Sequence, residues 1–203
     1  MSEIDSEEIL KIAKGFLIVG IISLVPNILG AIIPNLLMFF LVKGILFSKM
    51  VVSSFFLIFI ILGIIVIVLL IIATSKQYSL LNDNLKALIL SYGLPENNFN
   101  KAKKFYIFSP IAMGFFSVIL IFFVLFFISP PPIIFIVFLI FLLITVVFAI
   151  LGLIGTIYYG IAIYQCGKSA DIKVLLAGGI LLIVSPAIGA ILVYVGLKKL
   201  AEY

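Results

Sequence analysis

Side chains that could carry out chemistry are few in this chain and form no recognisable catalytic pattern. There is one cysteine, Cys166, there is no histidine, and all 13 basic residues are lysine. A cysteine nucleophile needs a neighbouring base or positive charge, and the only acidic residue close to it in sequence is Asp171. A single cysteine also forms neither an intrachain disulfide nor a metal cluster. We therefore expect Cys166 to be a small residue near a helix end.

The acidic residues argue in the same direction. All eight lie outside the apolar stretches of the chain, whereas transporters, pumps and proton relays usually place ionisable groups inside the membrane. We find no carboxylate pair, no Gly-rich phosphate loop and no nucleophile beside a base. The sequence thus predicts a protein that is not an enzyme and has no cofactor, no catalytic residue and no metal site.

The elements that would have to position any such site are very apolar. Hydrophobic residues make up 66% of the chain and charged residues 10%, against about 45–50% and 25% in ordinary soluble domains. Four uncharged stretches each exceed the roughly 18 residues typical of a spanning helix: 15–42, 50–75, 105–167 and 174–197. The predicted fold class is all-α: a single helical transmembrane domain over 1–203, polytopic, with about five transmembrane helices plus an interfacial amphipathic helix.

The first two helices are expected in the N-terminal third. Asp5 and Glu8 have capping-box spacing, so the first helix should begin near Ser6 and run to about residue 33. Pro34 suggests a break. Residues 34–49 are then expected to be a shallow segment returning to the interface, although a further span stays open. The second helix should cover about 51–74.

A polar connector over 76–104 follows. Within it Leu81, Leu85, Leu88 and Tyr92 recur at helical spacing, which predicts an amphipathic helix lying on the membrane face as an interfacial connector. The alternative interpretation is that the same helix is a docking surface for a partner protein.

Three more spans are expected after the connector. The third should cover 105–128, start with a lysine cluster and be capped by one of the asparagines at 97, 98 or 100. The fourth, about 133–165, would be about 50 Å long and must tilt or protrude. The fifth, 174–197, contains Ser185-Pro186. We expect one kinked span there, because the halves of a hairpin would be too short to cross.

Lysine and tyrosine are expected to mark the membrane interfaces. Five spans would place nine lysines on the side of the 76–104 connector and four on the other, so that connector should be cytoplasmic, the 166–173 segment a loop beside it, and the C-terminus outside. The predicted interface residues are Lys101, Lys103, Lys104, Tyr106, Tyr158, Tyr159, Tyr164, Lys168, Tyr194, Lys198 and Lys199.

Small residues in the fourth helix predict where helices pack. Glycine and other small side chains let helix backbones approach closely in lipid, where no hydrophobic force drives association. Those at 152, 156 and 160 repeat every four residues on one face, and those at 155 and 162 line another. The predicted packing residues are Gly152, Gly155, Thr156, Gly160 and Ala162.

Residues 158–199 resemble a known family. Tyr164-Gln165-Cys166-Gly167, Gly178-Gly179-Ile180-Leu181 and the run Ile191-Leu192-Val193-Tyr194-Val195-Gly196-Leu197 are similar to an archaeal family of membrane proteins, domain of unknown function 973. The resemblance implies a multi-helix archaeal membrane protein and supplies no activity or site residues.

Two function classes follow from these observations. The first is an integral membrane protein without a catalytic site, an accessory subunit or helix-packing scaffold of a membrane assembly. Its partners would be the lipid bilayer and other membrane subunits or a second copy of itself. The second is a passive carrier or channel for a hydrophobic or neutral solute, suggested by proline inside two of the helices. Lysines at the ends of apolar segments favour lipid binding and not nucleic acid.

Overall fold

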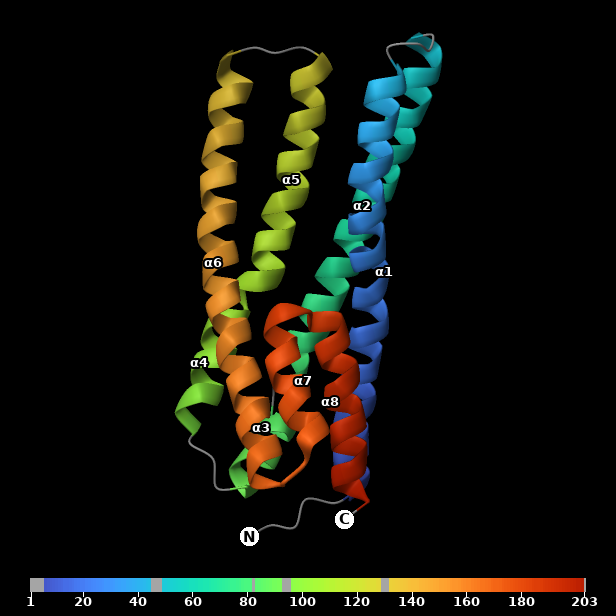
Figure 1. Cartoon of the computed structure of the whole chain (residues 1–203). Coiled ribbons are helices and arrows are strands. Elements are labelled where there is room, and N and C mark those ends of the chain that lie inside the picture. The colour runs from blue at the N-terminus through green and yellow to red at the C-terminus, as the bar shows by residue number, and fades with distance from the viewer. Residues whose placement is uncertain (1–5, 45–48, 82, 93–95, 129–131, 203) are drawn as a thin grey trace.

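The chain folds into α-helices joined by short connections (Figure 1). The computed structural model describes residues 6–44, 49–81, 83–92, 96–128 and 132–202. Within those ranges the helices are α1 (Ser6–Gly44), α2 (Lys49–Leu80), α3 (Asp83–Ser91), α4 (Glu96–Tyr106), α5 (Phe108–Ile128), α6 (Pro132–Ser169), α7 (Lys173–Val184) and α8 (Pro186–Ala201). The all-α prediction is confirmed. Among the described residues, three helices are long and apolar enough to cross a membrane: 6–29, 61–80 and 135–169.

The first helix starts where the sequence predicts and ends much later. It begins at Ser6 with acidic Glu7 and Glu8 in its first turn, while Asp5 lies outside the described residues. It then continues through Pro34 to Gly44, so the predicted break is wrong, and so is the shallow segment predicted over 34–49 as far as residue 44; 45–48 lie outside the described residues. Apolar surroundings leave the backbone no water to bond with, and a long helix keeps most of its internal hydrogen bonds despite a proline.

The helix predicted to begin with the lysine cluster and to span 105–128 is two helices, and the second of them, α5, covers most of the predicted span. Pro110 lacks an N–H, and its ring would clash with the carbonyl of residue 106 if one helix continued. The chain accordingly leaves α4 at Tyr106 and starts α5 at Phe108. The lysine cluster therefore belongs to α4, a separate amphipathic helix, and the asparagines predicted as caps for the span also lie inside α4.

The C-terminal apolar stretch is a helical hairpin, so the predicted single kinked span is wrong. Ser185 has a ψ of 88°, which ends α7, and Pro186 occupies the first turn of α8, where a missing N–H costs nothing. The two arms pack directly together, with Gly189 of α8 against the backbone of Leu182 in α7. The arms are indeed too short to cross a bilayer. They need not cross, because the hairpin enters and leaves at the same end of the molecule (Figure 1).

This hairpin lies between α1 and α6, and its contacts fix how far it reaches. A methyl group built on Gly20 of α1 would lie 2.6 Å from Ile191 of α8, and one on Gly160 of α6 would lie 2.6 Å from both Gly179 and Ile183 of α7. The tip of the hairpin is therefore level with the residues near 20 in α1 and near 160 in α6. The end of α8 and the start of α1 lie at the same end of the bundle (Figure 1). The predicted opposite placement of the two termini is wrong.

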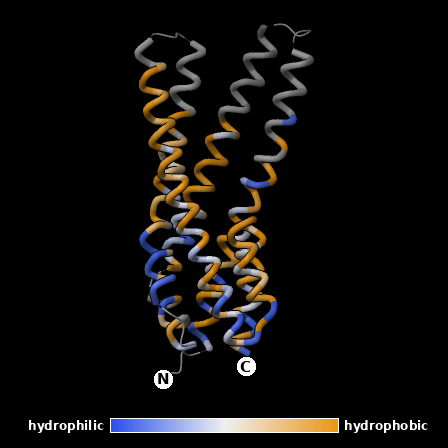
Figure 2. Tube along the Cα trace, turned by 60° about the vertical axis from the view of Figure 1, so that its left-hand side comes forward, coloured by the Kyte–Doolittle hydropathy of each residue, from blue (hydrophilic) through white to orange (hydrophobic). Residues whose placement is uncertain are grey.

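Beyond the hairpin tip, the long helices expose apolar side chains. On α6 these run from Phe135 to Ile157, and on α2 from Ile61 to Ile72. We call these exposed side chains the apolar belt. Its extent on α6 is about 33 Å at 1.5 Å per residue, close to the roughly 30 Å hydrocarbon core of a bilayer. Hydrophilic residues gather at the other end of the molecule (Figure 2).

Below the belt, the helix ends form what we call the head: α3, α4, the α7–α8 hairpin and the adjoining parts of α1, α2 and α6. Its centre holds the largest fully buried side chains, among them Phe16, Phe99 and Tyr159. Leu85 and Leu88 of α3 are also buried in this core. The amphipathic pattern of α3 is thus covered by protein, which overturns the prediction that its apolar face lies on the membrane. In the sequence, Gly93 and Pro95 predict the end of this helix, and both lie outside the described residues.

Candidate functional site

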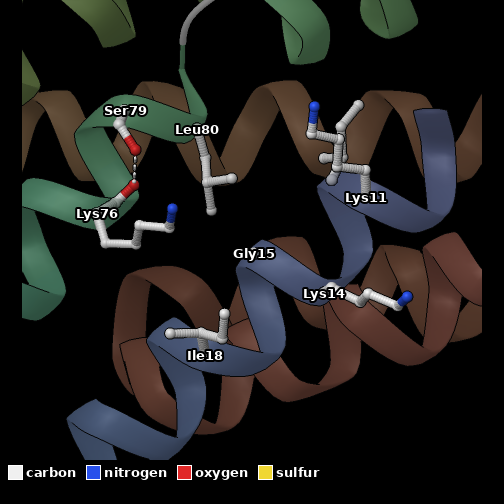
Figure 3. Close-up of a pocket in the computed structure, with 8 residues that line it drawn as sticks. Lys11, Lys14, Gly15, Ile18, Lys76, Ser79 and Leu80 are labelled. Atoms are coloured by element: carbon white, nitrogen blue, oxygen red, sulfur yellow. Dashed lines mark hydrogen bonds between the residues drawn. The ribbon is translucent and has the colours of Figure 1, made fainter.

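The head contains a groove between the lower parts of α1 and α2, with a volume of about 400 Å³. We call it the lysine groove. Its lining residues are Lys11, Ile12, Lys14, Gly15 and Ile18 of α1, and Lys76, Ser79 and Leu80 of α2. Figure 3 shows Leu80 pointing from α2 toward Gly15, with Lys76 beside it and Lys11 and Lys14 on the facing helix.

Glycine makes this groove narrow. A methyl group on Gly15 would meet the side chain of Leu80, so the two helices touch at the floor through Gly15. Ser79 does not face the groove as a free donor, because its hydroxyl donates to the Lys76 carbonyl at 2.8 Å (Figure 3). The polar groups available to a ligand are therefore ammonium groups, which bind anions and not cations.

A second polar group lies fully inside the head, where α2, α4 and α6 meet. The Tyr106 hydroxyl donates to Oε1 of Gln77 at 2.7 Å, and the Tyr106 ring stands edge-on to that of Tyr159, with ring centroids 5.9 Å apart. Nε2 of Gln77 and the Tyr159 hydroxyl are buried without a hydrogen-bond partner. Unsatisfied buried polar atoms cost about 1–3 kcal/mol each, so this cluster is a locally destabilised point in the core.

Helix α4 is fastened to its neighbours by polar contacts. Lys101 lies over the ring of Tyr158 at 5.3 Å from its centroid, and Asn98 donates to Gln165 at 3.4 Å. An ion pair of 2.6 Å joins Lys86 of α3 to Glu96 of α4. The hydrogen bond and charge from Lys86 lower the pKa of the Glu96 carboxyl. These contacts hold α3 and α4 against α6 and are structural, not chemical, in character.

The residues predicted to pack helices lie at several interfaces of α6. A methyl group built on Gly152 would lie 2.9 Å from backbone atoms of Ser109 in α5. Gly155 faces the backbone of Tyr106 in α4, and Gly160 faces α7. Ala162 is buried in the head core. Thr156 is half-buried and donates to the Gly152 carbonyl of its own helix at 3.0 Å. Together they place α6 against α4, α5 and α7.

The residues predicted to mark the membrane interface divide into two groups. Tyr106 and Tyr159 are buried in the head core, with 3% and 0% exposure, and do not face lipid headgroups. The remainder are exposed or half-buried on the head: Lys101, Lys103, Lys104, Tyr158, Tyr164, Lys168, Tyr194, Lys198 and Lys199. Tyrosine type alone did not distinguish a core position from an interface position.

Cys166 lies within α6 and not in a loop, because that helix continues to Ser169. Its thiol is free and the residue is 1% exposed, packed in the head core. Within the ranges that the structure describes, no three His, Cys, Asp or Glu side chains come together as a metal site would require. The sequence did not single out Lys11, Lys14 and Lys76 together, since their proximity depends on how α1 and α2 pair.

Comparisons of the chain with protein-family models, with curated proteins and with solved structures found no match. Inferences about function consequently depend on the geometry described above.

Proposed function

We propose that this protein is an integral membrane protein without a catalytic site that serves as an accessory subunit or helix-packing scaffold of a membrane assembly. The observation that carries the proposal is the close approach of helix backbones at glycine. Gly155 against Tyr106, Gly160 against Gly179 and Gly20 against Ala187 each bring one helix backbone beside another. Such packing suits a rigid framework, because small residues let helix backbones approach closely enough for extensive van der Waals contact.

We propose that α1, α2, α5 and α6 span the bilayer, with the apolar belt in its hydrocarbon core and the head on the cytoplasmic side. The hairpin brings Lys198 and Lys199 to the same end as the nine lysines that the sequence assigned to the cytoplasmic side, which leaves only Lys43 and Lys49 at the other end. The positive-inside rule favours this orientation more strongly than the five-span arrangement did.

The proposal is tested by isolating the tagged chain from its own membrane in a mild detergent and measuring the protein mass of the particle by light scattering. The chain alone has a mass of 22.3 kDa. We expect either two or more copies of that mass or one co-purifying membrane protein at a fixed ratio. A monodisperse single chain without a stoichiometric partner would count against a subunit or scaffold.

The alternative is a passive carrier or channel for a hydrophobic or neutral solute. The unpaired polar atoms of Gln77 and Tyr159 favour it, since such atoms tolerate burial better where water or a polar solute passes. Carrier or channel activity would be measured as solute entry into liposomes that contain the purified chain. Flux that is lost in Gln77→Leu, with assembly unchanged, would select the carrier over the scaffold.

We also propose kinship with the archaeal family of domain of unknown function 973. It is based on the motifs quoted from residues 158–199 alone. Those motifs fall on the end of α6 and on the hairpin, so the kinship predicts that a similar hairpin occurs in that family. A structure of one member without a hairpin would argue against it.

A further inference from the structure

The lysine groove carries the positive charge of three lysines. None of its eight lining residues is acidic, and the ion pair of Lys86 with Glu96 joins α3 to α4, away from the groove. Lys11 follows the acidic first turn of α1 within about one turn of helix, which reduces its field. Lys14 lines the groove from α1 and Lys76 lines it from α2, and their exposed side chains supply the rest of its positive charge.

The groove also spans a change from polar to apolar surroundings. Lys76 follows Ile72, the last exposed apolar residue of the belt on α2, by about 6 Å, and Lys14 precedes Ile18 on α1 by about 6 Å. Ile18 itself is 46% exposed. The polar layer on each side of a bilayer core is about 5–7 Å thick. In the proposed bilayer position, Lys76 therefore lies at the depth of lipid phosphates, with apolar surface immediately toward the membrane. Lys14 lies about one helical turn further from the membrane, because its neighbour Gly15 packs against Leu80.

We propose that the lysine groove binds an anionic phospholipid, with Lys14 and Lys76 holding its phosphate and its acyl chains passing Ile18 along the apolar belt. The occupant is an amphiphile because the groove offers ammonium groups at one end and apolar surface at the other. The roughly 400 Å³ volume accommodates a phosphate headgroup and not the chains. This inference depends on the proposed bilayer position and is independent of whether the protein is a scaffold or a carrier.

The test is binding of phosphatidylglycerol to the full chain in detergent, measured by native mass spectrometry. Phosphatidylcholine with the same chains and inorganic phosphate are the comparison ligands. Two variants carry the same loss of charge: Lys14→Gln with Lys76→Gln, and Lys198→Gln with Lys199→Gln as the matched control. A lysine near lipid contributes about fivefold in affinity, so we expect the groove variant to bind phosphatidylglycerol roughly 30-fold more weakly.

Four results would support the inference together: weaker phosphatidylglycerol binding in the groove variant, an unchanged control, weaker binding of phosphatidylcholine, and no competition from inorganic phosphate at the lipid's own concentration. A variant with arginine at both groove positions keeps the charge and should bind like the wild type, even if the glutamine variant folds poorly. Equal losses in the groove and control variants would overturn a specific site. Competition by inorganic phosphate would overturn the lipid as occupant.

Discussion

Replacing Gly155 with alanine tests how tightly the end of α4 is held against α6. The added methyl would lie 2.6 Å from Cα of Tyr106 and 2.7 Å from the carbonyl carbon of Phe105. Both are backbone atoms, so no flexible side chain can move aside and a helix must shift. Inserting one methylene into a packed site usually costs about 1–3 kcal/mol, and a backbone contact belongs at the upper end of that range.

Alanine also favours the helix by up to about 1 kcal/mol over glycine, which leaves a net loss of about 2 kcal/mol for Gly155→Ala. For a chain of this size the melting temperature should fall by about 4–8 °C. The matched control is Gly63→Ala in α2, because nothing lies within 4 Å of a methyl at Gly63. That variant should melt at the same temperature as the wild type or slightly above it.

The assay is loss of helical circular dichroism on heating in detergent, since the chain contains no tryptophan to serve as a fluorescence probe. Binding of a stabilising lipid would raise the melting temperatures of the wild type, Gly155→Ala and Gly63→Ala together and leave their order unchanged. If Gly155→Ala and Gly63→Ala both melted at or above the wild-type temperature, the close approach of α4 to α6 would be refuted.

Three further outcomes follow from the head. Tyr106→Phe should lower the melting temperature, because it leaves Oε1 of Gln77 unpaired at a cost of about 1–3 kcal/mol. Tyr159→Phe removes a hydroxyl that has no hydrogen-bond partner, so its melting temperature should equal or exceed that of the wild type. A lower melting temperature for Tyr159→Phe would contradict this. Glu96→Gln should melt below the wild type at neutral pH. The pKa of Glu96 is lowered from 4.5 in the folded state, so its contribution is present above that value and is lost as the pH falls through the folded pKa; a difference that persists at lower pH would refute the ion pair as its cause. Lys199→Cys, with Cys166→Ala to remove the native thiol, should react with a membrane-impermeant thiol reagent in inverted vesicles and not in intact cells; the opposite pattern would reverse the proposed orientation.

The sequence predicted where the helices lie along the chain better than it predicted whether lipid or protein covers each of them. The start at Ser6 and the interiors of α2, α5 and α6 followed from long uncharged runs and a capping pattern, which are local properties. Two errors came from treating each apolar run as one span. Hydropathy does not distinguish a side chain covered by lipid from one covered by protein. The part of α6 that packs against α4 and α7 was therefore predicted as membrane-spanning.

Two errors concern proline. Pro34 was expected to break α1 and Pro186 to kink one helix, whereas α1 is continuous through the former and two helices meet at the latter. The difference lies in the preceding residue and the surroundings. Ser185 adopts an extended ψ that reverses the chain, and this choice depends on whether α1 and α6 leave room for a hairpin. The lysine groove was likewise not predictable, because Lys14 and Lys76 come to line one groove only through the pairing of α1 with α2.

The hairpin between α1 and α6 also has a consequence for how the protein is made. The face of α1 around Gly20 packs on α8, which is the last helix of the described chain to leave the ribosome. Synthesis proceeds at about 5–20 residues per second, so that face remains without its protein partner for roughly 8–30 s after α1 is complete. During this interval lipid or a chaperone must cover it. Closing the head is then a long-range step that depends on the C-terminal helices, and a stalled or truncated chain would keep its membrane helices while leaving the slot between α1 and α6 open.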